Sequence, residues 1–116
     1  MQHTSTTPIS FDDFLKVDTR AGTILTVTPN VKAKKPAYVL TIDFGDLGIK
    51  TSSAQITDHY TPEQLIGTQI IAVVNFEPKR IAGVVSEVLV LGCACPDATV
   101  VLLRPTQPVA NGSRVF

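Results

Sequence analysis

The 116-residue chain contains no tryptophan, two tyrosines and five phenylalanines. Proteins that bind single-stranded nucleic acid usually stack bases on aromatic side chains. Several of the few aromatic residues here, such as Tyr38 and Phe44, fall at positions that alternate like the buried face of a strand. The composition therefore disfavours stacking on unpaired bases as a mode of binding.

The chain has no excess of either charge, because ten lysines and arginines balance ten aspartates and glutamates. This balance argues against a polyanion binder that acts through charge density alone, so any affinity for nucleic acid must come from a local patch. No apolar run approaches the roughly 18 residues of a membrane helix, and the chain begins with no basic and apolar leader. We expect a soluble, cytoplasmic protein.

Cysteine and histidine are scarce, with two of each. Cys93 and Cys95 are one residue apart and have no second Cys/His pair, so one chain cannot supply the four ligands of a structural zinc site. A disulfide between them is disfavoured in a reducing compartment. His59 has no acidic or nucleophilic neighbour that suggests catalysis, and we expect a surface or packing role. We predict no catalytic residue, no metal site and no cofactor.

The length and the 44% hydrophobic content suit one domain with its own core. Residues 1–8 are polar and are predicted to form a disordered tail, with the domain over residues 9–116. Ser10 and Thr61 each begin a capping-box pattern, which predicts two short helices. Strand-like runs rich in β-branched or alternating apolar residues occupy 17–28, 38–44, 49–56, 69–76, 84–91 and 98–105.

The first strands are followed by a short helix and then by further strands. This order is that of the OB-fold, a five-stranded Greek-key barrel that binds ligands on its strand 2–3 face and adjacent loops. We therefore predict an all-β OB-fold with short helices. Gly22 lies in the middle of the first strand, where we expect a bend or bulge.

Basic residues gather in two connections of this predicted barrel. The loop after the first strand carries Lys32, Lys34 and Lys35, and the connection between the fourth and fifth strands carries Lys79 and Arg80. A lysine cluster of this kind is typical either of a solvated hairpin tip or of a phosphate-binding loop.

The third strand is rich in small polar residues. Lys50, Ser52, Ser53 and Gln55 are typical either of a polar edge strand that avoids aggregation or of a surface that offers groups to phosphates and sugars.

The run 84–91 is apolar at both alternating sets of positions. A small single-layer barrel has only one inner face to fill, so the second apolar face calls for a covering layer. We predict a homodimer with a sheet-based interface.

The stretch 75–87, Asn-Phe-Glu-Pro-Lys-Arg-Ile-Ala-Gly-Val-Val-Ser-Glu, closely resembles the signature of the tRNA-binding domain family. That family includes the C-terminal extension of bacterial methionyl-tRNA synthetase, stand-alone tRNA-binding proteins and EMAP II-type domains. The stretches 18–24 and 49–56 resemble its first- and third-strand motifs, and the match covers about residues 12–116. The run Ser52 to Ile56 and the Ser86-Glu87 pair are most similar to the CsaA branch, described as export-related chaperones.

The resemblance implies an OB-fold homodimer that recognises tRNA by shape and performs no catalysis. The matching positions imply RNA-binding roles for Asn75, Lys79, Arg80 and Ser86, and for Lys50, Ser52, Ser53 and Gln55 on the neighbouring strand. Glu87 stands where other branches often carry glycine, so it either orients Arg80 through a charge-assisted bond or suits a peptide ligand. The alternative function is a secretion chaperone that binds unfolded or preprotein chains in an apolar groove at the dimer seam.

Overall fold

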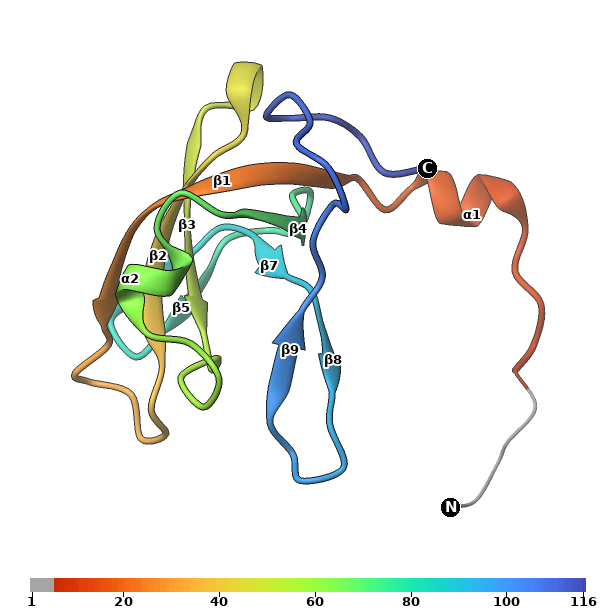
Figure 1. Ribbon diagram of the computed structural model, residues 1–116. Coiled ribbons are helices and arrows are strands. Elements are labelled where there is room, and N and C mark those ends of the chain that lie inside the picture. The colour runs from red at the N-terminus through yellow and green to blue at the C-terminus, as the bar shows by residue number, and fades with distance from the viewer. Residues whose placement is uncertain (1–5) are drawn as a thin grey trace.

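The computed structural model describes residues 6–116, and its chain forms a β-barrel with a short helix standing to one side (Figure 1). Residues 6–10 are exposed and belong to no helix or strand; the rest of the predicted tail, residues 1–5, lies outside the described residues. Helix α1, Phe11–Leu15, begins with the predicted capping box: the Asp13 amide donates to Ser10 Oγ at 3.1 Å. None of its residues is buried.

Five antiparallel strands form the main sheet in the order β3-β2-β1-β4-β7. Helix α2, Pro62–Leu65, lies between the third and fourth strands, and the short 3-10 helix η1, Gly45–Leu47, joins the second to the third. This arrangement confirms the predicted OB-like barrel. The strands span β1 (Thr19–Pro29), β2 (Tyr38–Asp43), β3 (Ile49–Ala54), β4 (Gln69–Val73) and β7 (Leu89–Val90).

The predicted fifth strand, 84–91, is not continuous. It divides into β6, Val84–Ser86, and β7, with Glu87 and Val88 between them. Strand β6 pairs with β5, Lys79–Ile81, in a separate hairpin, whereas β7 pairs with β4 in the barrel. A second hairpin follows the barrel and consists of β8 (Gly92–Ala94) and β9 (Val100–Leu102). The break lets one segment close the barrel and also carry a projecting hairpin.

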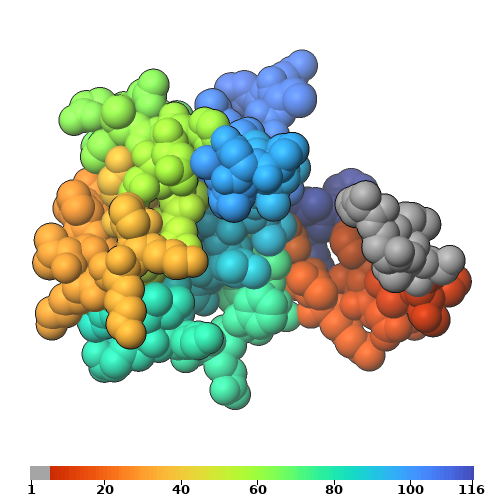
Figure 2. All heavy atoms as spheres, turned by 90° about the horizontal axis from the view of Figure 1, so that it is seen from below, coloured from red at the N-terminus to blue at the C-terminus, as the bar shows by residue number. Residues whose placement is uncertain are grey.

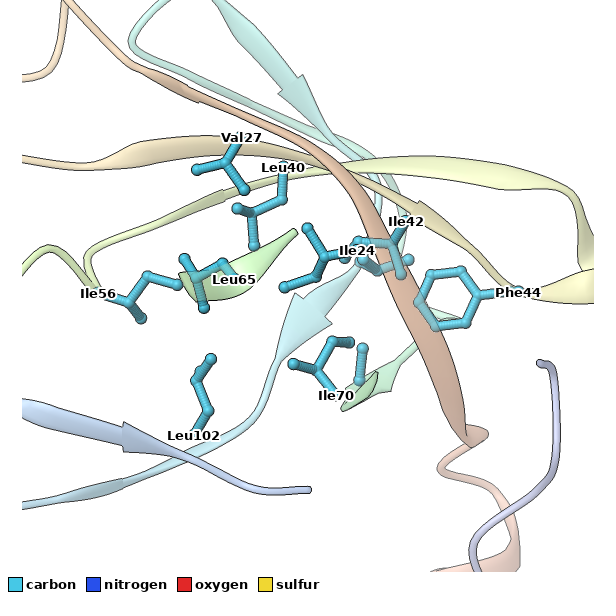
Figure 3. Close-up of a cluster of buried hydrophobic side chains, with 11 residues drawn as sticks. Ile24, Val27, Leu40, Ile42, Phe44, Ile56, Leu65, Ile70 and Leu102 are labelled. Atoms are coloured by element: carbon cyan, nitrogen blue, oxygen red, sulfur yellow. The ribbon is translucent and has the colours of Figure 1, made fainter. Parts of the chain in front are cut away.

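The core is a cluster of aliphatic side chains and Phe44 inside the barrel (Figure 3). Ile24, Leu40 and Ile42 from β1 and β2 are fully buried, and Leu65 of α2 packs on the same cluster. The register of β1 against β2 shifts between Ile24 and Thr26, so the irregularity of the first strand lies there and the expectation of a bulge at Gly22 was wrong.

Gly22 is instead required by packing. A Cβ at this position would lie 2.7 Å from Ile42 Cγ2 and from two ring carbons of Phe44. These neighbours are fully buried, so neither side chain has room to move away.

Backbone bonds, such as that from the Ala21 amide to the Ser113 carbonyl at 2.9 Å, fix the C-terminal segment to the start of β1, and two arginines add to them. Arg20 donates from Nε to Asp18 Oδ1 at 2.6 Å and from Nη1 to the Gly112 carbonyl at 2.9 Å, while Arg114 Nη2 reaches the Leu15 carbonyl at 2.7 Å. The Arg20 guanidinium, with a smaller effect from Arg114, lowers the pKa of the Asp18 carboxyl. No helix in residues 6–116 has the length and apolarity needed to cross a membrane.

Gly22→Ala is expected to destabilise the fold by about 2–3 kcal/mol, because the added methyl group overpacks a filled core. Gly67→Ala is the matched control: its Cβ would meet no atom within 4 Å, and only its positive φ of 84° is unfavourable, at about 1 kcal/mol. Urea unfolding measures both. Equal losses in the two variants would contradict the packing role of Gly22.

Asp18→Asn is expected to cost about 1 kcal/mol near pH 7, because it removes a charge-assisted pair whose carboxylate is one-quarter exposed. The pKa of Asp18 is lower in the folded state than in the unfolded chain. Its stabilisation is therefore present above about pH 4 and is lost as the pH falls through the folded pKa. The difference between variant and wild type in the free energy of unfolding, measured in urea, should therefore shrink as the pH falls. A difference that is constant down to pH 2 would contradict this account. Asp46→Asn serves as an exposed control.

Candidate functional site

The barrel is closed between β3 and the segment that contains β6, by one backbone bond and by two side-chain acceptors. The Glu87 amide donates to the Thr51 carbonyl at 2.7 Å, and the Thr51 amide donates to Glu87 Oε1 at 3.1 Å. Two residues along β3, the Ser53 amide donates to Ser86 Oγ at 3.2 Å. Thr51 and Ser53 use the same edge of β3, since amides two residues apart in a strand point the same way. Ser86 and Glu87 thus replace the backbone acceptors of a regular ladder.

The same polar network continues into the loop of residues 31–36, called the lysine loop below. Asn30 Nδ2 donates to Ser53 Oγ at 3.4 Å, and Asn30 Oδ1 accepts the amide of Lys32 at 3.2 Å. Asn30 is buried, with 8% of its surface exposed. Sequence reasoning missed this residue, although an Asn that follows Pro29 and precedes a loop is a typical side-chain turn former. Asn30 fixes the base of the lysine loop to β3.

Lys79 and Arg80 lie in a strand of the basic hairpin, residues 79–86, and not in a loop as predicted. Because successive strand residues point to opposite faces, Lys79 shares a face with Ile81, and Arg80 lies on the other face. The turn of this hairpin is Ala82-Gly83, both with positive φ, which matches the twist of a two-residue hairpin. The basic pair is therefore divided between two faces.

The lysine loop reaches this turn. A Cβ on Gly83 would lie 3.0 Å from Lys32 Cδ and 3.5 Å from Lys32 Nζ. In Figure 2 the orange atoms of the lysine loop lie against the teal atoms of the basic hairpin. Within residues 6–116 none of the lysines of this loop, nor Lys79 or Arg80, forms an ion pair, and all five are exposed. The fold therefore brings the two predicted basic connections together as one cationic end, in which Lys32 meets the hairpin turn while Lys35 lies beside Asp58.

The third strand supplies fewer surface groups than its composition suggests. Ser52 is only 1% exposed and packs in the core opposite Leu40, so its hydroxyl is not available on this surface. Lys50 is half-buried, and Gln55 is exposed just beyond the strand. Ser53 and Ser86 take part in the closure network. Of the small polar residues predicted to face RNA, three hold the barrel together.

Asn75 also has a structural contact. Its Nδ2 donates to the Lys16 carbonyl at 2.7 Å, and its Oδ1 accepts the Asp18 amide at 2.9 Å. These bonds join the segment that follows α1 to the connection between β4 and β5. Glu87 does not orient Arg80: the pair forms no ion pair in the part of the chain described, and the Glu87 carboxylate contacts the Thr51 amide.

An apolar groove of about 450 Å³ lies beside the basic hairpin. Phe76 and Leu89 are 56% and 51% exposed there, and Ile81 continues the apolar wall. Its polar margin consists of Lys79, Ser86 and two glutamates, Glu77 and Glu87. The groove forms within one chain and shares Lys79 with the cationic end.

His59 has partners that its sequence neighbours do not reveal. Its Nε2 lies 2.7 Å from Thr99 Oγ1, and Thr99 Oγ1 donates to Asp97 Oδ1 at 2.6 Å. The Thr99 hydroxyl, and to a smaller extent His59, lowers the pKa of Asp97. The hydroxyl lies between the imidazole and the carboxylate, whereas a nucleophilic triad needs the imidazole in the middle. The three residues join the loop before α2 to the β8–β9 hairpin.

Cys93 and Cys95 are free thiols on that hairpin. Residues 6–116 contain no group of three His, Cys, Asp or Glu side chains placed to hold a metal ion.

Comparison with known proteins identifies the family. Residues 19–114 match the model of the putative tRNA binding domain. Methionine–tRNA ligase of Porphyromonas gingivalis is 38% identical over 107 residues, which cover 92% of this chain but 15% of that enzyme. The chain thus spans only 14–16% of the length of the methionine–tRNA ligases that it matches.

Two solved structures match along their whole length. Chaperone CsaA of Bacillus anthracis is 52% identical, with a TM-score of 0.90 over 95% of this chain and 100% of that chain. The CsaA chaperone protein of Picrophilus torridus is 49% identical, with a TM-score of 0.87 over 94% and 100%. The family-model match and these two relatives show that the chain belongs to the tRNA-binding domain family, in its CsaA branch.

Proposed function

We propose that this domain, residues 9–116, acts as a CsaA-like homodimer that binds folded tRNA in the cytoplasm without catalysing a reaction. The observation that carries this proposal is the cationic end, where the lysine loop and the basic hairpin meet at Gly83. Five exposed cations that form no ion pair within residues 6–116 are the kind of local patch that a chain of zero net charge needs for binding phosphates.

The type of RNA follows from the side chains around this patch. Phe76 is the one aromatic residue of the neighbouring groove, and a single ring is a poor platform for consecutive unpaired bases. Lysine and arginine side chains on two connections instead suit phosphates that a folded RNA presents along its backbone. We therefore favour recognition of tRNA by shape.

The homodimer rests on apolar surface that one chain leaves uncovered. Ile9 and Phe11 are about 70% exposed on and beside α1, which buries none of its residues. A five-residue helix is unstable without packing against a neighbour, so a second copy of the chain is the occupant we propose for this face. The sheet-based interface predicted from the sequence would instead use Val85 and Leu89, which are 45% and 51% exposed.

A second candidate function is the binding of unfolded or preprotein chains as an export-related chaperone. The groove beside the basic hairpin favours it, since Phe76, Ile81 and Leu89 offer apolar contacts to an extended segment. Both CsaA relatives are named as chaperones, which is consistent with this role.

The RNA function is tested by the salt dependence of tRNA binding. We expect the log of the affinity to fall linearly with the log of the salt concentration, by about 0.7–0.9 for each phosphate neutralised. Lys32→Ala, Lys79→Ala and Arg80→Ala should each reduce this slope by about one such contact. Lys16→Ala, an exposed lysine at the end of α1, is the matched control and should leave the slope unchanged.

An unfolded apolar peptide measured beside tRNA separates the two functions. Peptide binding that is independent of salt and of the lysine variants, without any tRNA affinity, would leave only the chaperone function. Because Lys79 and Arg80 lie on opposite faces of the hairpin, the single variants also show which face meets the RNA.

Size-exclusion chromatography with light scattering tests the dimer. We expect twice the 12.4 kDa chain mass at micromolar concentration. Phe11→Ser should weaken dimerisation about a hundredfold, since two buried phenylalanines are lost per dimer. Leu89→Ser makes the same kind of change on the strand face. If Leu89→Ser weakens dimerisation more than Phe11→Ser does, the interface is formed by the sheet and not by α1. A wild-type monomer at this concentration would refute the dimer.

A further inference from the structure

We propose that Glu87, together with Ser86, is a positioning residue for the RNA-binding cations and makes no contact with the ligand itself. This inference rests on the proposed tRNA-binding function, because it says how the basic hairpin is held in a binding geometry. It also gives Glu87 a role that does not depend on repulsion or attraction between its charge and the ligand.

The bonds of Glu87 support this role. Its carboxylate accepts the Thr51 amide and its own amide donates to the Thr51 carbonyl, so both backbone groups of one β3 residue are satisfied by Glu87. β3 is paired along its other edge with β2, over the full length of both strands. The position of Glu87 relative to the sheet is thus fixed at two points.

The basic hairpin depends on this attachment. Strand β5 pairs only with β6 among the named strands, and β6 pairs only with β5. Backbone ladders therefore leave the hairpin separate from the five-stranded sheet, and Ser86 and Glu87 join its end to β3. Lys79 pairs directly with Ser86 across the hairpin, so a shift of this junction moves the lysine with it.

The lysine loop is positioned through the same junction. Ser53 gives its amide to Ser86 and accepts from Asn30 with its hydroxyl, and Asn30 holds the amide of Lys32. The two cationic connections consequently share one point of attachment on β3. Loss of the junction is expected to separate them.

The experiment compares Glu87→Ala with Glu87→Gln. The glutamine keeps an oxygen that can accept the Thr51 amide, while the alanine leaves this amide without an acceptor. Glu77→Ala is the matched control, because it removes a carboxylate from the same groove without touching β3. Each variant is measured for binding of folded tRNA across a salt series and for hydrogen exchange of the Thr51 amide by NMR.

Glu87→Ala should weaken tRNA binding about tenfold and make the salt slope shallower by about 1.5, which corresponds to two lost phosphate contacts. Exchange of the Thr51 amide should accelerate in the same variant. Glu87→Gln should bind within about twofold of wild type and protect the amide, so the conservative variant rescues both readouts.

Two outcomes would overturn the inference. In the first, Glu87→Ala and Glu87→Gln bind equally, or both tighten binding together with Glu77→Ala; the charge of Glu87 would then act on the ligand directly. In the second, the Thr51 amide exchanges at the wild-type rate in Glu87→Ala. Should this variant fail to fold, Ser86→Ala tests the same junction through the Ser53 amide, with faster exchange and a shallower slope expected.

Failure of the proposed function has a different signature. A wild-type protein without salt-dependent tRNA affinity would reject the RNA function. The positioning role would then be judged by the chemical shifts of residues 79–86, which should change in Glu87→Ala and remain as in wild type in Glu87→Gln. Unchanged shifts in Glu87→Ala would reject the positioning role as well.

Discussion

Closure of the barrel at the outer edge of β3 is the constraint on which the remaining structure depends. The amides of Thr51 and Ser53 point away from β2 at this edge and need acceptors, because an unpaired buried amide is unfavourable. Side chains of Ser86 and Glu87 supply them. Since side-chain acceptors follow no ladder geometry, the chain is free to leave the barrel between β4 and β7 and to form the basic hairpin.

This solution separates two kinds of polar residue. The small hydroxyl and amide groups around the seam, at Asn30, Ser53 and Ser86, bond to backbone groups or to one another. The lysines of the lysine loop, Lys79 and Arg80 are instead exposed and form no ion pair within residues 6–116. Short side chains reach nearby backbone atoms at little entropic cost, whereas long charged ones keep their solvation at the surface. Composition alone places both kinds in one motif and does not distinguish their roles.

The order of elements and both capped helices were predictable from the sequence, because capping boxes and alternation depend on neighbouring residues alone. The break in the strand at Glu87 was not predictable from the sequence. The run 84–91 has apolar residues at both alternating sets of positions, and the point at which its pairing partner changes is set by how the barrel closes. Gly22 was expected to mark a bend or bulge for the same reason: its constraint is close packing against Ile42 and Phe44, which lie at least 20 residues away in the chain. His59 likewise meets Thr99 only after folding.

Strand alternation in the basic hairpin links the two candidate functions. Lys79 shares a face with Ile81 and lines the apolar groove, whereas Arg80 lies on the opposite face. A polypeptide in the groove would therefore contact the stem of Lys79, whose ammonium group the RNA function also needs. If the domain has both proposed functions, the two ligands would meet at this one side chain, and binding of one would be coupled to binding of the other. Each strand of the hairpin has only three residues, and Lys79 is the single lysine among them. The hairpin therefore offers no second lysine that could serve one ligand while Lys79 serves the other.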